Sequence, residues 1–388
     1  MAVIQEVGRR TNDSQLTDWY LGTDRWLLLS VCIMIFVGMI AAVSTGSANS
    51  IRVHGALPWY HFFVKMVPFY LVGLGTLFVT SMFNRKLVLG IAWLNVLICL
   101  PLLLITFIHP QVVNGSTRWV VLAGIKLMPS DIMKPGFVIL TAWFLTRMKE
   151  KFGDNIFMNK EAWKLNWSSW WPYVLVFLMV LGIMFKQPDV GTSILYFLVL
   201  AIMLFVAGLP KKIIGIMAGM GAGGLLVAFL IWPHVHQRFM DFFSKPLDPL
   251  SQVGYAVNAI RQGGLLGMGD EAFAAENLPM AENDFVYAAL VEDFGAIAGC
   301  CLLFLFIWVI KRLINSATQA RDKFVLYVIT GTTALFSVQI CLNLATTLHV
   351  MPPKGMTLPF ISFGGSSFLG FCLLFGLTLA LISEDKWK

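Results

Sequence analysis

The sequence predicts an all-α integral membrane protein with about ten transmembrane helices. Hydrophobic residues make up 58% of the 388 residues and charged residues only 13%, whereas a soluble domain carries roughly 25% charged residues. The mean hydropathy is +0.77. The apolar residues gather in runs of about the length that crosses a bilayer as a helix. Residues 1–388 are therefore predicted to form a single polytopic membrane domain.

The apolar runs lie at about 26–44, 64–82, 87–107, 136–146, 170–185, 191–208, 213–231, 285–310, 324–346 and 368–383. The fourth run is short and is expected to recruit Ile132 and Met133. The fifth and sixth runs are separated by a tight turn, because Pro188 ends the preceding helix. Residues 1–25 are polar and are predicted to be a tail, with the first run acting as an uncleaved signal anchor.

The distribution of positive charge predicts the orientation. Ten crossings place both termini on one side, and the loops on that side carry most of the 28 Lys and Arg residues. Positive residues collect on the cytoplasmic side of a membrane, so the amino and carboxyl termini are predicted to be cytoplasmic. This topology accounts for the net charge of +7, and no nucleic-acid partner is predicted.

Three loops on the opposite side are predicted to carry the function. They run over about 108–135, 232–284 and 347–367 and are not low-complexity segments, which is typical of functional loops. The longest, between helices 7 and 8, is the expected extracytoplasmic catalytic loop. Its Gly263–Gly269 stretch is expected to let the backbone approach a ligand closely.

Asp284 ends this loop directly before an apolar run, and the sequence leaves two interpretations open. Aspartate is a favoured helix N-cap, and a carboxylate held at a membrane surface can act as a general base. Glu292 lies further along the same run, where an ionisable side chain is expected to face a polar interior. It forms either a buried structural ion pair or part of the same cavity as Asp284.

Several cations and small residues on this side suggest a phosphate ligand. Positive residues are few there, so a cluster of them points to an anion, although each could also be a side chain that snorkels to the interface. The amides of a Gly-Gly-Ser-Ser turn would add an anion site. The candidate substrate-binding residues are Arg118, Lys134, Arg261, Lys354, Glu292, Asp189, Gly364 and Ser366. The cysteines and histidines show no metal-ligand spacing, so no dedicated metal site is predicted.

Taken in order, these motifs resemble the SEDS proteins of bacteria (shape, elongation, division, sporulation) over nearly the whole chain. The matching motifs are Gly115-Ser-Thr-Arg118-Trp119, Pro129-Ser-Asp-Ile-Met-Lys134-Pro135, Pro188-Asp-Val-Gly-Thr192, Gly263–Gly269, Leu278-Pro279 with Asp284-Phe285, Glu292, Gln339 with Asn343, and Lys354-Gly-Met-Thr-Leu-Pro359 with Gly364-Gly-Ser-Ser367. The form of the loop from Lys354 to Ser362 is more similar to the division members than to the elongation members.

The resemblance implies a peptidoglycan glycosyltransferase. Such an enzyme polymerises the lipid-linked precursor lipid II at the outer face of the bacterial cytoplasmic (inner) membrane, with a class B penicillin-binding protein as transpeptidase partner. A division member would act at the septum with other divisome membrane proteins. The resemblance places the catalytic aspartate at Asp284, as general base, and the cations at the pyrophosphate leaving group. A divalent cation (Mg or Mn) could share that task, and the polyprenyl tails would lie in grooves between helices, among membrane lipid.

The sequence departs from the family pattern in places, most clearly before Asp284, and two other functions stay open. Residues 278–285 read Leu-Pro-Met-Ala-Glu-Asn-Asp-Phe, where the family commonly has Leu-Pro-Glu-x-His-Thr-Asp-Phe. The first alternative is a lipid II flippase, which needs a polar path across the bilayer. The second is a non-catalytic divisome scaffold, in which Asp284 would be dispensable. The spans contain few polar residues and the motifs gather in the loops, which favours surface chemistry.

Overall fold

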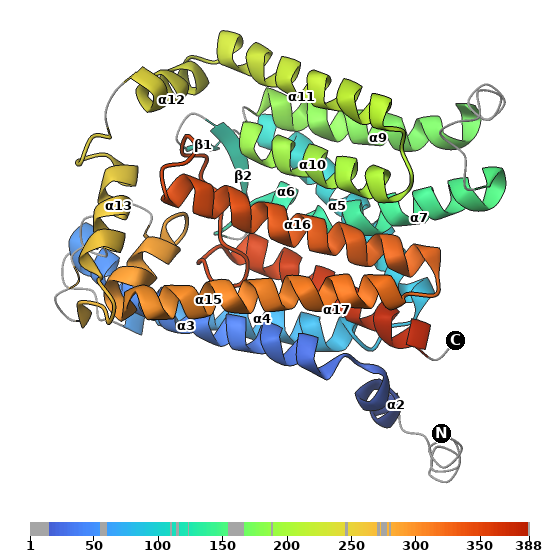
Figure 1. The fold of residues 1–388 in the computed structure, drawn as a ribbon, viewed down its shortest axis with the longest axis horizontal. Coiled ribbons are helices and arrows are strands. Elements are labelled where there is room, and N and C mark those ends of the chain that lie inside the picture. Colours follow the sequence, from blue (N-terminus) through green and yellow to red (C-terminus); the bar gives the residue numbers. More distant parts are fainter. Residues whose placement is uncertain are drawn as a thin grey trace.

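The computed structural model describes residues 15–54, 60–108, 111–113, 116–122, 124–153, 167–187, 189–244, 247–269, 272, 278 and 281–386. Within them the chain is mainly helical, with one small sheet in a loop (Figure 1). In chain order the elements are α2 (Gln15–Gly22), α3 (Arg25–His54), α4 (Tyr60–Thr80), α5 (Arg85–Ile108), β1 (Gln111–Val113), β2 (Ser116–Leu122), β3 (Ile125–Leu127), α6 (Pro129–Ile132), α7 (Lys134–Phe152), α9 (Trp167–Lys186), α10 (Val190–Val206), α11 (Lys211–Ile231), α12 (Pro233–Ser244), α13 (Gln252–Gln262), α15 (Val286–Gln319), α16 (Lys323–Thr347) and α17 (Gly365–Lys386).

Each predicted apolar run lies within one helix or extends at most two residues beyond it, which confirms the membrane fold class. Among the described residues, six helices are long and apolar enough to cross a membrane: α3, α5, α11, α15, α16 and α17. Three more, α4, α9 and α10, contain shorter apolar stretches. The remaining run lies in α7, whose first three turns are almost wholly buried in the bundle. The turn between α9 and α10 is where the sequence predicted it, while Pro188 itself lies outside the described residues.

The helices form a bundle with α17 at its centre and α11 at its edge. In the most apolar stretch of α17, 83% of the residues are buried by protein, compared with 6% in α11. The α17 helix packs closely on α4, and α16 packs on both α10 and α15. Leucine and phenylalanine fill the centre, and Phe336, Phe360, Phe371 and Phe375 form a group of contacting rings. Such close packing gives the loops at the bundle ends a rigid support.

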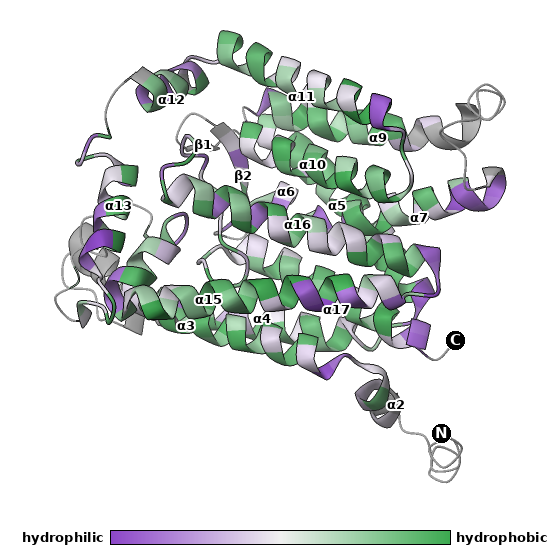
Figure 2. Cartoon of the chain, in the orientation of Figure 1, coloured by the Kyte–Doolittle hydropathy of each residue, from purple (hydrophilic) through white to green (hydrophobic). Residues whose placement is uncertain are grey.

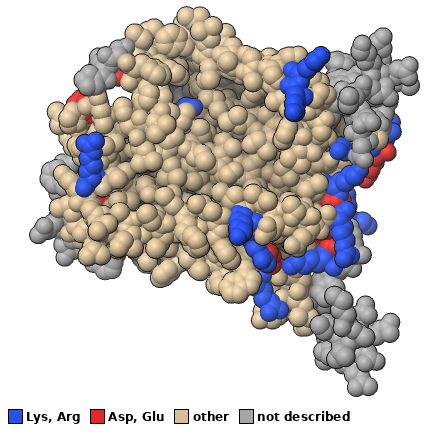
Figure 3. All heavy atoms as spheres, viewed as in Figure 1, with Lys and Arg blue, Asp and Glu red and all other residues tan. Residues whose placement is uncertain are grey.

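The two ends of the bundle differ in charge. Figure 2 shows a hydrophobic middle with hydrophilic residues toward both ends. In Figure 3 most of the visible Lys and Arg gather at the end where both described termini lie, which is the distribution expected of a cytoplasmic end. The opposite end, called the distal end below, contains β1, β2, α12 and α13 (Figure 1). Figure 3 also shows a hollow on the distal half, with a basic side chain at its edge.

The first distal loop forms a small antiparallel sheet that an all-α prediction did not include. Strand β2 pairs with β1 on one side and β3 on the other, with Val120 opposite Leu127. Gly124 has a φ of 82° in the turn between β2 and β3, a conformation that glycine adopts without strain. The sheet fixes β2, and with it Arg118, over the distal end of α5.

A backbone break interrupts α15 at Gly295, and the Gly263–Gly269 loop fills it. Gly295 has a φ of 86° and a ψ of 170°, outside the helical region. The amides that follow it therefore lack helical partners, and loop carbonyls accept their hydrogen bonds instead. The Ala296 amide donates to the Gly264 carbonyl (2.9 Å) and the Ile297 amide to the Leu265 carbonyl (3.3 Å). In return, the Met268 amide donates to the Glu292 carbonyl (2.8 Å).

These contacts give Gly263 and Gly267 a structural role, while the expected approach of the loop to a ligand stays a prediction. A Cβ on Gly263 would lie 2.2 Å from the Val291 carbonyl oxygen, and one on Gly267 would lie 2.3 Å from the Asp293 carbonyl oxygen. Both distances are shorter than van der Waals contact allows. The glycines are thus needed because the loop backbone lies directly on the backbone of α15.

We expect Gly295→Ala to destabilise the protein by about 2 kcal/mol or more, because the new Cβ combines a left-handed conformation with a clash. That Cβ would lie 2.2 Å from the Leu265 carbonyl oxygen. The matched control is Gly219→Ala in α11, where a Cβ meets nothing within 4 Å and alanine favours the helix. Thermal melting of the purified proteins in detergent checks this. Equal melting temperatures for the two variants would contradict the account of the break.

Candidate functional site

The segment before α15 is held in place by hydrogen bonds to its backbone. The Asn343 side-chain amide, from α16, donates to the Asp284 carbonyl (2.9 Å) and to the Met356 carbonyl (2.6 Å). One side chain therefore joins the segment 281–285 to the loop between α16 and α17. Asn343 is 2% exposed, and hydrogen bonds made by a buried amide are costly to lose.

Two further bonds join the same two segments. The Ser362 hydroxyl donates to the Asn283 carbonyl and accepts from the Leu358 amide. The Phe363 amide donates to the Glu282 carbonyl (2.8 Å). Within residues 282–284, the groups that accept these hydrogen bonds are all main-chain carbonyls. The backbone at Asp284 is thus fixed without use of its carboxylate.

The N-cap interpretation of Asp284 is wrong. The residue that caps α15 is Phe285, and no side chain forms a cap hydrogen bond there. The Asp284 carboxylate is aimed at the loop between α16 and α17 instead, since a Cβ built on Gly355 would lie 3.2 Å from its Oδ2. Within the described part of the chain, no hydrogen bond or ion pair is made by this carboxylate. It is therefore available to a ligand.

The environment of Asp284 shifts its acidity toward neutrality. Burial raises the pKa of Asp284 to about 6, with a further upward contribution from Glu282 and Asp131, while the charges of Arg118 and Arg238 lower it. Burial dominates because it disfavours the charged form. A carboxylate with a pKa near 6 is ionised at neutral pH and still accepts a proton readily.

Arg118 and Asp189 form an incompletely satisfied pair beside this carboxylate. The Arg118 Nη1 lies 3.3 Å from the Asp189 Oδ1, which also accepts from the Thr192 amide at the start of α10. Two further polar atoms, Arg118 Nε and Asp189 Oδ2, are buried and have no hydrogen-bond partner among the described residues. Buried polar groups are normally paired, so this part of the site has unused capacity for a polar ligand.

Arg238, on α12, is a cation that the sequence analysis missed. Its Nη1 donates to the Pro353 carbonyl (3.3 Å), which ties α12 to the loop between α16 and α17. Burial lowers the pKa of Arg238, as does the charge of Arg118, whereas Asp284 raises it. These couplings place two arginines around one carboxylate. The available signal was the amphipathic pattern of 233–244, which predicts a helix where a loop was assumed.

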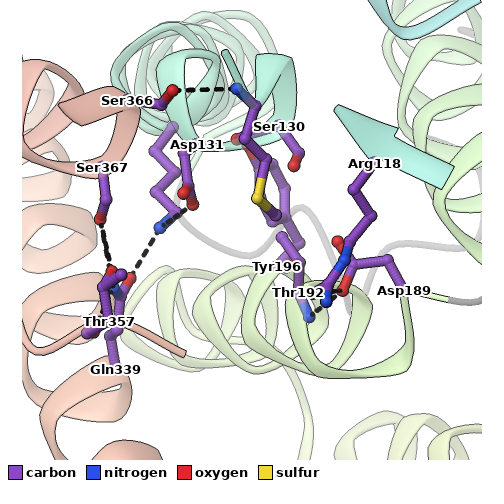
Figure 4. Close-up of polar contacts among 12 residues, drawn as sticks. Arg118, Ser130, Asp131, Asp189, Thr192, Tyr196, Gln339, Thr357, Ser366 and Ser367 are labelled. Atoms are coloured by element: carbon purple, nitrogen blue, oxygen red, sulfur yellow. Dashed lines mark hydrogen bonds and ion pairs between the residues drawn. The ribbon is translucent and has the colours of Figure 1, made fainter. Parts of the chain in front are cut away.

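Lys134 is also at the distal side, but it is wholly inside the protein. It is 1% exposed, and its Nζ lies 2.6 Å from Asp131 Oδ1 and 2.7 Å from Gln339 Oε1 (Figure 4). Its charge is therefore already matched by a carboxylate one turn earlier. A buried pair of this kind is weak evidence for stability, but removing one partner leaves an uncompensated charge.

The Lys134 pair continues into a network that joins three segments (Figure 4). The Gln339 side-chain amide donates to the Thr357 carbonyl (2.9 Å), and the Thr357 hydroxyl donates to Ser367 Oγ (2.9 Å). Its neighbour Ser366 accepts from the Met128 amide (2.9 Å). Loop 348–364 is thus attached to α7, α16 and α17.

The other predicted residues occupy different surroundings. Lys354 is partly buried, and burial lowers its pKa to about 8. Its Cβ lies 3.6 Å from the position that a Cβ on Gly191 would take, so it lies at the start of α10, next to Gly355. Arg261 is exposed in the last turn of α13, and Glu292 is buried in α15.

Gly364 precedes α17 and packs against Thr357. Within the described residues, no three His, Cys, Asp or Glu side chains are grouped so that they could hold a metal ion. A magnesium-type site can be built from one or two carboxylates and substrate phosphates. Among the described residues, the protein side chains alone do not supply a closed metal site.

Comparison with known proteins agrees with this architecture. The model of the family described as "Cell cycle protein", FtsW/RodA/SpoVE, matches residues 25–386. The chain belongs to this family. The resemblance to the SEDS proteins is therefore confirmed, and the chain is a multi-pass membrane protein.

Its relatives include proteins named "Probable peptidoglycan glycosyltransferase FtsW". The one from Caulobacter vibrioides is 30% identical over 376 residues, which cover 97% of this chain and 93% of the relative. The one from Thiomicrospira cyclica is 30% identical over 379 residues, which cover 94% and 93%. Both relatives carry the name FtsW.

Two solved structures have the same fold. A chain from the study "Structural coordination of polymerization and crosslinking by a peptidoglycan synthase complex" gives a TM-score of 0.71 at 23% identity and covers 94% of this chain and 99% of its own. The Rod shape determining protein RodA from Thermus thermophilus gives 0.66 at 21% identity, with 94% and 98% covered. The distal loops of this family member are therefore set on the bundle common to the family.

Proposed function

We propose that this FtsW/RodA/SpoVE protein is a peptidoglycan glycosyltransferase that polymerises lipid II at the outer face of the cytoplasmic membrane during cell division. The observation that carries the proposal is the Asp284 carboxylate, which has a fixed backbone, no partner among the described residues and a pKa near 6. The names of its relatives supply the substrate class. The distal end of the bundle is then the outer face, opposite the basic cytoplasmic end.

In the proposed reaction Asp284 is the general base. The acceptor sugar hydroxyl attacks the anomeric carbon of the growing chain, and its proton passes to the Asp284 carboxylate. The bond from the anomeric carbon to the undecaprenyl pyrophosphate breaks, and the pyrophosphate leaves with the electron pair. A positioned base of this kind contributes roughly 10²- to 10⁴-fold to a rate.

The leaving group gains negative charge, so nearby cations stabilise the transition state. Arg118 and Arg238 act electrostatically on Asp284. Lys354 is the chain neighbour of Gly355, where an added Cβ would lie 3.2 Å from the same carboxylate. We assign these three to pyrophosphate binding. The paired carboxylate of Asp189 orients Arg118, since the two side chains are 3.3 Å apart.

The remaining predicted residues are given supporting roles. We assign three of them, Lys134, Gly364 and Ser366, to holding loop 348–364. They lie in or beside the hydrogen-bond network that attaches this loop to the helices. Buried Glu292 accepts the Met268 amide at its carbonyl and supports the glycine loop. Arg261 is exposed, and we assign it to contact with the substrate head group.

The proposed partner is a class B penicillin-binding protein, which would cross-link the glycan product. The support is a structural neighbour taken from a peptidoglycan synthase complex. The division-type relatives support a place at the septum, together with other divisome membrane proteins.

The deciding experiment is glycan synthesis from labelled lipid II by the purified protein with its partner. We expect Asp284→Asn to lower the rate at least about 100-fold, because the amide cannot accept the proton. Muramidase digestion of the product is the control for a true glycan. Equal product from wild type and variant would refute the base, and no product from either folded protein would favour a scaffold or a flippase.

The rate should also depend on pH in a way set by the same carboxylate. Only the ionised form of Asp284 accepts a proton, so the wild-type rate should fall about tenfold per unit below pH 6 and level off above it. Removal of the positive charge at Arg238 should raise the pKa of Asp284, since that charge lowers it.

Arg238→Gln is therefore expected to move the midpoint of this pH profile upward and to reduce the plateau rate about tenfold. Arg238→Lys keeps the charge and should leave the midpoint in place. Lys211→Gln, at the start of α11 at the basic end of the bundle, is the control for a general loss of positive charge. An unshifted midpoint in Arg238→Gln would show that Arg238 does not act on Asp284.

A further inference from the structure

Two leucines at the tip of the Gly263–Gly269 loop are almost fully exposed. Leu265 is 71% exposed and Leu266 is 81% exposed. The rest of the loop is well packed, because Gly263 and Gly267 lie directly on the backbone of α15. Adjacent exposed leucines on an otherwise well-packed loop mark an interaction surface.

The polar contacts of α3 locate this loop relative to the bilayer. Near one end of α3, Asp24 pairs with Arg312 of α15 (2.8 Å). Further along α3, Ser44 donates a hydrogen bond to Asp293 of the same α15. The twenty residues between Asp24 and Ser44 rise about 30 Å in a helix, which is the thickness of the hydrocarbon core. Asp293 therefore marks the distal boundary of that core.

The loop joins α15 on the hydrocarbon side of this boundary. Its carbonyls accept the amides of Ala296 and Ile297, which follow Asp293 within about one turn. Ala298 is part of an apolar groove between α3 and α15 that also contains Ile40 and Ala41 of α3. These α3 residues precede Ser44 by about one turn. Both helices therefore place the loop about one turn inside the boundary marked by Ser44 and Asp293.

Leu265 also lines a groove on the outer surface of α15, with a volume of about 400 Å³, together with Ala296, Ile297, Cys300, Cys301 and Phe304. All these side chains are apolar or weakly polar, and Ile297 and Phe304 are 54% and 67% exposed. The groove shares Cys301 and Phe304 with the α3–α15 groove. The leucine tip is therefore continuous with the lipid-facing surface of a membrane-spanning helix.

The loop backbone is suited to an apolar medium. Its carbonyls at Gly263, Gly264 and Leu265 accept hydrogen bonds from the amides of Gly267, Ala296 and Ile297. Irregular backbone is excluded from lipid chiefly because unpaired polar groups are costly there. Here three main-chain amides, at Met268, Ala296 and Ile297, find carbonyl partners across the break, which lowers that cost.

We propose that the Gly263–Gly269 loop is a membrane-inserting element, whose Leu265 and Leu266 enter the outer leaflet and close the distal end of a groove occupied by a phospholipid acyl chain. The inserted leucines would set the depth of the α15 break. This inference is independent of the reaction assigned to Asp284.

The test uses the full-length protein with the photo-crosslinking residue p-benzoylphenylalanine in place of Leu266. The protein is reconstituted in nanodiscs of phosphatidylethanolamine and phosphatidylglycerol, irradiated, and weighed by intact-mass spectrometry. The matched control carries the same residue in place of Asp248, an exposed polar position in the turn before α13. We expect at least ten times more phospholipid adduct at position 266 than at 248.

Equal adduct at the two positions, or none at 266, would overturn the proposal. An adduct with polyprenyl carrier lipid in preference to phospholipid would overturn the assigned occupant, and a crosslinked second polypeptide would replace the lipid with a protein. If the variant at 266 fails to fold, the same measurement at Leu265 gives the answer. Thermal melting identifies that case.

Discussion

The buried amide of Asn343 is the contact on which the distal end depends. It bonds two main-chain carbonyls, at Asp284 and Met356, from segments that belong to no helix or strand. Near the level of the membrane, irregular backbone persists only where protein groups pair its carbonyls and amides. Without this side chain, two buried carbonyls would lose their partner, which costs about 1–3 kcal/mol each.

The need to pair irregular backbone is met in another way at the α15 break. There the partners are main-chain groups of the glycine loop, and glycine is required because the two backbones nearly touch. Side chains such as Ser362 and Gln339 do the equivalent work in loop 348–364. The packed core supplies the rigid frame, and polar pairing places Asp284 on that frame beside Arg118 and Arg238.

The sequence predicted the helices well and the pairing poorly, for a physical reason. Apolar runs of membrane length are local signals, so each corresponds to a helix. The fit of Gly267 on Asp293 and the bond from Asn343 to Asp284 join distant segments. No local pattern encodes them. Arg238 was missed because α12 was taken for a loop, although its amphipathic pattern was visible.

The most direct test of the central claim is glycan synthesis by Asn343→Leu, which keeps the number and branching of the side-chain heavy atoms and removes both hydrogen bonds. If Asn343 holds Asp284 in position, the rate should fall about 100-fold in a protein that still melts cooperatively, since misplacement of a catalytic group by about 1 Å can cost that much. Melting temperature and partner binding distinguish this from unfolding. A folded Asn343→Leu protein with the wild-type rate would contradict the account.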